Sequence, residues 1–296
     1  RQAAQSMVVI HIKKGDQSQF LFETTVAQPV DDFIAQAVQV YNGRLKIGRI
    51  CDEISELEKH GLTLPPNMQG LTDEQVTELK LRDEWGEKCT PSGGFVESRD
   101  PIGRRNGRAP TENIVQVLSK TRKEARQMIS KDLVAAGQAV NMARIQEALQ
   151  ILSGAMTIAY PMGLPPHEPI RMELQNEEDL SGTQASLGVI PPGDASAWFS
   201  GKEMQAGKLL SDYLGRNEKC KAIVKLAKRG QGPPAREPVV SEQEQKEMMA
   251  FYYRKQQEAK KLEESRDDSY MDSEWADSQQ LRRAFHGLSD IKWGPK

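Results

Sequence analysis

The sequence predicts an α+β protein, and three observations lead to that class. Near the N-terminus, apolar and polar residues alternate from Val8 to Lys13, as in a half-buried strand. In the middle, residues 111–153 carry apolar side chains at helical intervals of three and four. Residues 154–230 contain further short apolar and alternating runs. The predicted architecture is therefore an N-terminal β-hairpin with helices, a helical middle, a second sheet region, and a C-terminal extended helix and tail.

Composition and charge limit the classes of partner. The chain has 296 residues, which suggests about two domains. Its 40 basic and 42 acidic residues leave a formal net charge of −2. The sequence therefore predicts no overall positive electrostatic field that would attract nucleic acid or an anionic membrane. No run approaches the length of a membrane-spanning helix, and the apolar segment that begins at Met7 is too short for a signal peptide. We interpret Arg1 to Ser6 as a non-native remnant that precedes the native start of the chain at Met7.

Cysteine usage indicates a reducing compartment. The chain has three cysteines, an odd and small number, at Cys51, Cys89 and Cys220. Together with a mean hydropathy of −0.62, this predicts a soluble cytosolic protein with a modest core.

Residues 7–61 are expected to form a hairpin followed by helices. Gly15 and Asp16 mark the turn between the two strands. A helix with a core-facing apolar stripe follows Asp32, and Asn42-Gly43 is expected to end it. A second helix is expected to run to Gly61. Two interpretations stay open: a second β-grasp, or a hairpin that joins another sheet.

Residues 62–110 are rich in turns and contain a compact basic cluster. Thr72 and Gln75 have capping-box spacing, which predicts a short helix. The cluster comprises Arg104, Arg105 and Arg108 in a glycine-flanked loop. The sequence favours a solvated surface loop, and the functional alternative is a contact for an acidic partner or a phosphate. Two amphipathic helices with a break near Gly137 are expected in the following 43 residues, 111–153.

Residues 154–230 resemble a ubiquitin-like β-grasp domain. We expect strands at 155–160 and 170–174 and a crossing helix at 179–189. The stretch Trp198–Arg229 carries the resemblance, with an apolar strand, two glycine turns, a Leu-Ser-Asp-Tyr turn and a closing strand. The Tyr213 hydroxyl is expected to reach a backbone partner while its ring is buried.

The same resemblance suggests an interaction surface. Position matching places Trp198 and Val224 on the apolar recognition face of a ubiquitin-like domain, although a slip of one residue reverses the face. The chain continues for more than sixty residues after Gly230, so the domain is embedded and is not a conjugated modifier.

The C-terminal part, residues 231–296, begins with a glycine- and proline-rich linker. A capping box from Ser241 to Glu244 opens a long helix whose narrow apolar stripe includes Tyr252 and suits docking or a short coiled coil. Phe285 and Trp293 lie among basic residues in the tail, as in a peptide that docks on its own chain or on a partner. The predicted domains are 7–61, 62–153, 154–230 and 231–296.

The sequence contains no catalytic constellation. The four histidines are scattered, the spacing of Cys51 and His60 does not suit a metal site, and nucleotide-binding glycine motifs are missing. We therefore expect no catalytic residues, no metal, no cofactor and no small-molecule substrate. A reactive thiol at Cys89 is the one enzymatic alternative.

Several blocks of the sequence are distinctive, namely Leu64–Asp73, Asp83–Cys89, Tyr160–Pro166, Glu178–Gln184, Arg229–Glu237, Phe285–Gly287 and Asp290–Trp293. Together they resemble the cilia- and flagella-associated protein 298 family, also called Kurly, and the resemblance covers Met7 to about Trp293. It implies a non-enzymatic protein of motile cilia, located in the cytoplasm, the cilium or flagellum and the basal body. Its implied role is the assembly of axonemal outer dynein arms, with links to planar cell polarity.

The implied partners are dynein-arm assembly factors and axonemal dynein subunits. Two functions remain open after this resemblance. The first is a cytoplasmic adaptor or scaffold in dynein-arm assembly. The second is a structural axonemal component bound to doublet microtubules.

Overall fold

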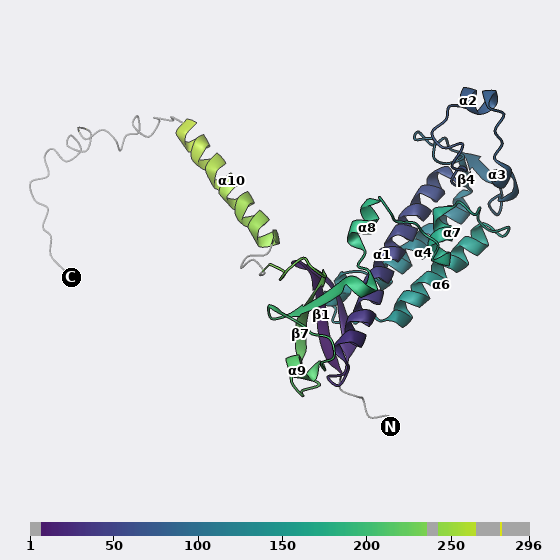
Figure 1. Ribbon diagram of the computed structural model, residues 1–296. Coiled ribbons are helices and arrows are strands. Elements are labelled where there is room, and N and C mark those ends of the chain that lie inside the picture. Colours follow the sequence, from purple (N-terminus) through teal and green to yellow (C-terminus); the bar gives the residue numbers. More distant parts are fainter. Residues whose placement is uncertain (1–6, 236–241, 265–278, 280–296) are drawn as a thin grey trace, which may run out of the picture. The chain divides into compact units, whose positions relative to one another are not determined.

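The computed structural model describes residues 7–235, 242–264 and 279 (Figure 1). The chain divides into two units, residues 1–236 and 237–296, and each is described by itself. Among the residues that the structure describes, the first unit contains all the strands and all the named helices except the one at residues 242–264. These elements confirm the predicted α+β class.

Five strands form one mixed sheet in the first unit, in the order β2–β1–β7–β5–β6. They are β1 (Val8–Lys14), β2 (Gln17–Thr24), β5 (Ala195–Phe199), β6 (Lys202–Glu203) and β7 (Lys221–Lys228). β1 pairs in parallel with β7, and the other neighbouring strands are antiparallel. The N-terminal hairpin therefore joins strands from the other end of the unit, as one of the two interpretations predicted.

One long helix, α1 (Val30–His60), connects the sheet to the rest of the unit (Figure 1). Its 31 residues span about 46 Å. The expected helix end at Asn42-Gly43 is wrong, because the helix continues to His60 and Gly61 follows at a φ of 79°. Asn42 instead bonds both backbone groups of Ile190, with its Nδ2 donating at 2.7 Å and its Oδ1 accepting at 3.1 Å.

Two further helices pack against α1 and against each other. They are α4 (Glu112–Met128) and α6 (Met142–Ala159), separated by the short α5 (Asp132–Ala135) and a turn at Gly137. This confirms two helices with a break near Gly137. The predicted strand at 155–160 is wrong, because those residues continue α6. Ala155, Met156 and Ala159 extend the buried face of that helix at helical spacing.

The predicted strand at 170–174 is also helical. It lies in α7 (Pro169–Gln175), which begins with a proline and ends at Asn176 in the left-handed conformation. Burial does not follow the alternation of apolar and polar residues in the sequence, because the two buried positions are Ile170 and Glu173, three residues apart as on one face of a helix. The expected crossing helix at 179–189 is reduced to α8 (Gln184–Gly188), with a 3-10 turn, η1 (Pro192–Asp194), ahead of β5.

The end of α1 distant from the sheet carries a small, turn-rich region. It contains α2 (Asp73–Glu78), α3 (Glu84–Lys88), β3 (Phe95–Glu97) and β4 (Arg108–Pro110). β3 and β4 form an antiparallel pair. The predicted capping box is present, since the Thr72 hydroxyl accepts from the Gln75 backbone and the Gln75 side chain accepts from the Thr72 backbone.

The turn after β6 agrees with the sequence in detail. A short helix, α9 (Ser211–Leu214), follows the glycine turns, and the Tyr213 hydroxyl accepts from the backbone N–H of Gln205 at 2.8 Å. The connection order of the whole sheet is hairpin, helix, strand pair, short helix and closing strand. The β-grasp interpretation predicted the same order, but the hairpin and helix that open it are formed by residues 8–60. Residues 61–194 separate the two halves in sequence.

The second unit contains α10 (Glu242–Glu264), close to the predicted helix. Its exposed apolar residues include Met248, Phe251, Tyr252 and Leu262, and the rings of Phe251 and Tyr252 meet edge to face at 6.2 Å. Its N-cap position, Ser241, lies outside the described residues. In the described part of the chain, no helix combines the length and apolarity needed to cross a membrane.

Candidate protein-interaction site

The two residues predicted on the sheet surface have different environments. Trp198 lies half-buried on β5, opposite Lys225, and its ring N–H donates to the Ser196 hydroxyl at 3.3 Å. Val224 is fully buried, so its predicted place on a recognition surface is wrong. Side chains alternate between the two faces of a strand, and β7 turns Ile223 outward instead.

The three arginines of the basic cluster also differ from one another. Arg105 is buried, which contradicts the predicted solvated loop. Arg104 is more exposed and binds Glu53 on α1 at 3.0 Å. Arg108 donates to the Gly86 carbonyl at 3.0 Å and lies 5.2 Å from the centre of the Phe95 ring. These contacts are all within the chain, so the cluster is largely structural.

The remaining predicted contact residues lie towards the C-terminus. Tyr252 is exposed on α10, as its docking role requires. Phe285 and Trp293 lie outside the described residues.

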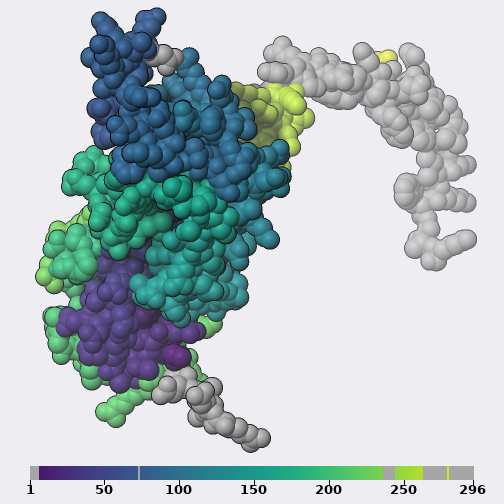
Figure 2. All heavy atoms as spheres, turned by 90° about the vertical axis from the view of Figure 1, so that its right-hand side faces the viewer, coloured from purple at the N-terminus to yellow at the C-terminus, as the bar shows by residue number. Residues whose placement is uncertain are grey.

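A groove of about 770 Å³ opens between residues 64–76 and 95–108, and we call it the 64–108 groove. Its apolar lining includes Leu64, Met68, Leu71, Val76, Phe95 and Ile102. The two walls are joined by backbone bonds, since the N–H of Leu64 donates to the Arg104 carbonyl and that of Gly70 to the Gly103 carbonyl, both at 2.9 Å. Figure 2 shows this blue region at one end of the first unit, with the purple hairpin at the other.

A single carboxylate shapes one wall of the groove. Asp100 accepts hydrogen bonds from three backbone N–H groups, those of Ile102, Arg104 and Arg105, at 2.9–3.0 Å. Burial by itself would raise the pKa of the Asp100 carboxyl, but these three donors together hold it below its usual value. The turn therefore projects Ile102 outward while the chain at Arg105 runs inward.

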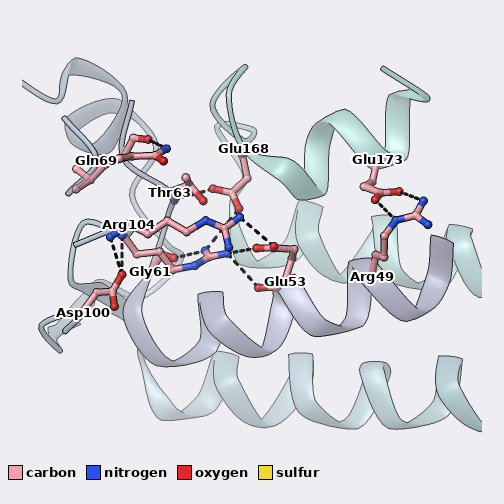
Figure 3. A network of polar contacts seen from close by, with 11 residues as sticks. Arg49, Glu53, Gly61, Thr63, Gln69, Asp100, Arg104, Glu168 and Glu173 are labelled. Carbon is pink, nitrogen blue, oxygen red and sulfur yellow. Dashed lines mark hydrogen bonds and ion pairs between the residues drawn. The ribbon is translucent and has the colours of Figure 1, made fainter. Parts of the chain in front are cut away.

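Beneath the groove lies a buried ionic anchor formed by Arg105, Glu53 and Glu168 (Figure 3). The Arg105 guanidinium donates to the Gly61 carbonyl at 2.7 Å and to the Glu53 carboxylate at 2.6 Å, and it lies 3.5 Å from Glu168. The other Glu168 oxygen accepts from the Thr63 backbone at 2.8 Å. The anchor thus joins the groove region to α1 and to the start of α7.

The anchor is deeply desolvated. Glu168 is fully buried, and burial raises the pKa of its carboxyl. Burial likewise raises the pKa of the neighbouring Tyr160 hydroxyl and of the Cys89 thiol. A buried thiol with a raised pKa is a poor nucleophile at neutral pH, which argues against the enzymatic alternative at Cys89.

Large apolar side chains are exposed in and near the segments that build the groove, and two of them, Phe95 and Ile102, line it. Five of them lie between residues 79 and 102, namely Leu79, Trp85, Phe95, Val96 and Ile102. Exposed apolar side chains that share one region with a groove are typical of a protein contact. Within the described residues, no group of three or more His, Cys, Asp or Glu side chains is arranged to hold a metal ion. The arrangement therefore favours docking of a protein segment.

Sequence reasoning missed the residues that build this site. Asp100 had a recognisable signal, because Asp followed by Pro and Gly is typical of a turn whose carboxylate bonds the backbone. Glu53 and Glu168 had no such signal, since their roles depend on an arginine 52 and 63 positions away in the sequence.

The chain is similar to proteins of one family along almost its whole length. Residues 195–291 match the family model described as cilia- and flagella-associated protein 298. The protein of that name from Danio rerio is 59% identical over 290 residues, which cover 98% of this chain and 100% of the relative. Protein 298-A from Xenopus laevis is 58% identical over the same shares, and the Drosophila melanogaster relative is 49% identical over 97% and 99%. No solved structure matches the chain.

Proposed function

The chain belongs to the cilia- and flagella-associated protein 298 family, and from this premise we propose that it is a non-enzymatic adaptor in the cytoplasmic assembly of axonemal dynein arms. Its proposed partners are dynein-arm assembly factors and axonemal dynein subunits. Its proposed sites of action are the cytoplasm and the basal body.

The 64–108 groove is the observation that carries the adaptor role. It combines a concave apolar surface with a firmly held frame, because Asp100 shapes its wall and Arg105 fixes its base. A pre-organised surface loses little conformational freedom when a partner binds. We therefore place the partner's apolar anchor residue in this groove, next to Ile102.

A pull-down from the cytosol of ciliating cells tests this proposal. The informative variant is Ile102→Asp, because Ile102 is 79% exposed and lines the groove. The matched control is Leu187→Asp on α8, where the leucine is 71% exposed and does not line the groove. We expect the wild type and the control to recover dynein subunits, and the groove variant to lose roughly tenfold in recovery.

Three results would count against the adaptor or its groove. Recovery of neither dynein subunits nor assembly factors by the wild type would contradict the adaptor role. If Ile102→Asp recovers dynein subunits as well as the wild type does, the contact with the partner lies outside the groove. Retention of the protein on demembranated axonemes, rather than in the detergent-soluble cytoplasm, would favour the structural axonemal alternative.

A further inference from the structure

The sheet has one face that is not occupied by α1. Side chains of β7 alternate, so that Ala222, Val224 and Leu226 point inward and are buried while Lys221 and Ile223 are exposed. Residues of neighbouring strands lie beside these two, with Val9 opposite Lys221 and His11 opposite Ile223. Trp198 lies on the same face, opposite Lys225. We call this surface the outer sheet face.

The centre of the outer sheet face is apolar. Ile223 is 46% exposed although it lies on a strand inside the sheet order and not at an edge. Trp198 is half-buried on the neighbouring strand, and Val9 is half-buried on the strand to the other side. Trp198 is paired with Lys225 and so lies diagonally across from Ile223 on the same face. An isoleucine exposed to this degree on a face that also carries a tryptophan provides the kind of apolar centre that a partner covers on binding.

The part of the chain that builds this region has a strong local charge. Residues 195–229 contain eight basic and three acidic side chains, whereas the whole chain is slightly acidic. Lys219 and Lys221 are exposed immediately before Ile223. A basic rim next to an apolar centre attracts a partner of the opposite charge and orients it on the surface.

The edge of the sheet at β2 is already occupied. The backbone N–H of Val140 donates to the Leu21 carbonyl at 2.8 Å, and residues 21 and 139 form a bridge. A partner strand therefore does not extend the sheet beyond β2 at this point. The opposite edge strand, β6, is only two residues long and offers little backbone for pairing, so the face is the larger available surface.

We propose that the outer sheet face is a docking surface for an acidic segment of a partner protein that carries aliphatic side chains. Acidic side chains of the segment contact Lys219 and Lys221, and an aliphatic side chain covers Ile223. This surface is separate from the 64–108 groove, and its binding does not depend on the proposed role in cilia.

Fluorescence anisotropy with the purified full-length chain tests this proposal. The probe is a labelled synthetic peptide in which Glu alternates with Leu, and the control peptide has Lys in place of Glu. We expect the acidic peptide to bind, and the double variant Lys219→Glu with Lys221→Glu to weaken its affinity on the order of tenfold. Ile223→Ser is expected to weaken it by a similar factor at unchanged net charge.

The matched control is Lys120→Glu with Lys123→Glu. These are two exposed lysines of α4, so the control changes the net charge equally away from the sheet. Circular dichroism confirms that each variant is folded. Affinity unchanged in the control supports the proposal.

Three outcomes would overturn the proposal. One is an equal loss of affinity in the α4 control, which would mean that only net charge matters. Another is equal binding of the Glu and Lys peptides. The third is self-association of the wild-type chain that the Lys219/Lys221 double variant abolishes, which would assign the face to a second copy of this protein.

Discussion

At the scale of single residues, Gly43 shows how closely two helices approach. A Cβ atom at this position would lie 2.7 Å from Cγ2 of Ile145 on α6. At Gly48, five residues later on α1, an added Cβ atom would have no neighbouring atom within 4 Å. The first glycine is therefore needed for packing, and the second is not.

Alanine substitutions at these two glycines should have opposite effects. Gly48→Ala should gain roughly 0.5–1 kcal/mol, because alanine favours the helix. Gly43→Ala should lose about 1–3 kcal/mol, because the overpacking outweighs that gain. Urea unfolding of both variants measures the difference. Equal stabilisation by the two substitutions would show that α1 and α6 are less closely packed than described.

Glu168 is the other residue whose surroundings determine its behaviour. Burial raises the pKa of its carboxyl in the folded state, so the folded protein holds this proton more tightly than the unfolded chain does. The ordinary pKa of a glutamate carboxyl is 4.5. The contribution of Glu168 therefore lowers the free energy of unfolding as the pH rises from 4.5 through the raised pKa of the folded state. At lower pH the group is protonated in both states, and this loss disappears.

The variant Glu168→Gln should lack this pH dependence. We expect its free energy of unfolding, relative to the wild type, to increase as the pH rises above 4.5. Chemical denaturation at a series of pH values measures the difference. Glu124→Gln, at an exposed position of α4, serves as the control for charge removal. A relative stability that falls with pH would show that the ion pair with Arg105 outweighs burial.

Some residue roles followed from the sequence because they depend on near neighbours. The capping box at Thr72 and the Tyr213 hydroxyl bond each join residues no more than eight positions apart. Asn42 bonds Ile190 and Glu168 bonds Thr63, and in both cases the partner is more than 100 positions away. The ion pair of Glu168 with Arg105 spans 63 positions. Local pattern carries no information about such partners.

At the scale of elements, two adjacent arginines attach the groove region to α1 with unequal strength. Both bind Glu53, but the Arg105 side chain is 2% exposed and that of Arg104 is 42% exposed. Removing one partner of a buried ion pair leaves the other charge without compensation. An exposed pair is already well solvated.

Arg105→Ala should therefore cost about 3–5 kcal/mol of stability. Arg104→Ala should cost about 0–1 kcal/mol. Thermal and urea unfolding measure the two losses, and hydrogen exchange should place the loosened amides of Arg105→Ala in residues 61–110. A small cost at Arg105 would mean that the buried anchor contributes little to holding the groove region on α1.

The errors in predicted elements have a common physical origin. Short runs such as 155–160 and 170–174 are apolar or alternating enough to suit a strand, although tertiary contacts hold them as helix. Gly154 did not end α6, because it is not among the glycines with positive φ and the helix runs through it to Ala159. Long periodic segments, such as those of α4 and α10, were predicted well because many residues contribute to the same pattern.

At the scale of the whole first unit, the sheet brings together strands from the beginning and the end of the unit's sequence. β1 and β7 are adjacent and parallel although more than 200 residues separate them in sequence. The sheet has the element order that the sequence predicted for residues 154–230, but its hairpin and helix are residues 8–60 and not residues 155–189, and the closing strand pairs with that N-terminal hairpin. A long insertion between two halves of a sheet is invisible to local patterns.

This arrangement predicts which fragments fold. Residues 7–235 contain the complete sheet and should unfold in one cooperative transition, like the full-length chain. Residues 154–230, the domain that the sequence predicted, lack β1, β2 and α1, so Val224 and Leu226 would lose the surfaces that bury them. Exposing buried aliphatic side chains costs about 1.5–3 kcal/mol each, which a small fragment does not offset. We expect no cooperative melt and no amide dispersion in this fragment, and a well-dispersed spectrum from it would show that 154–230 is an independent domain.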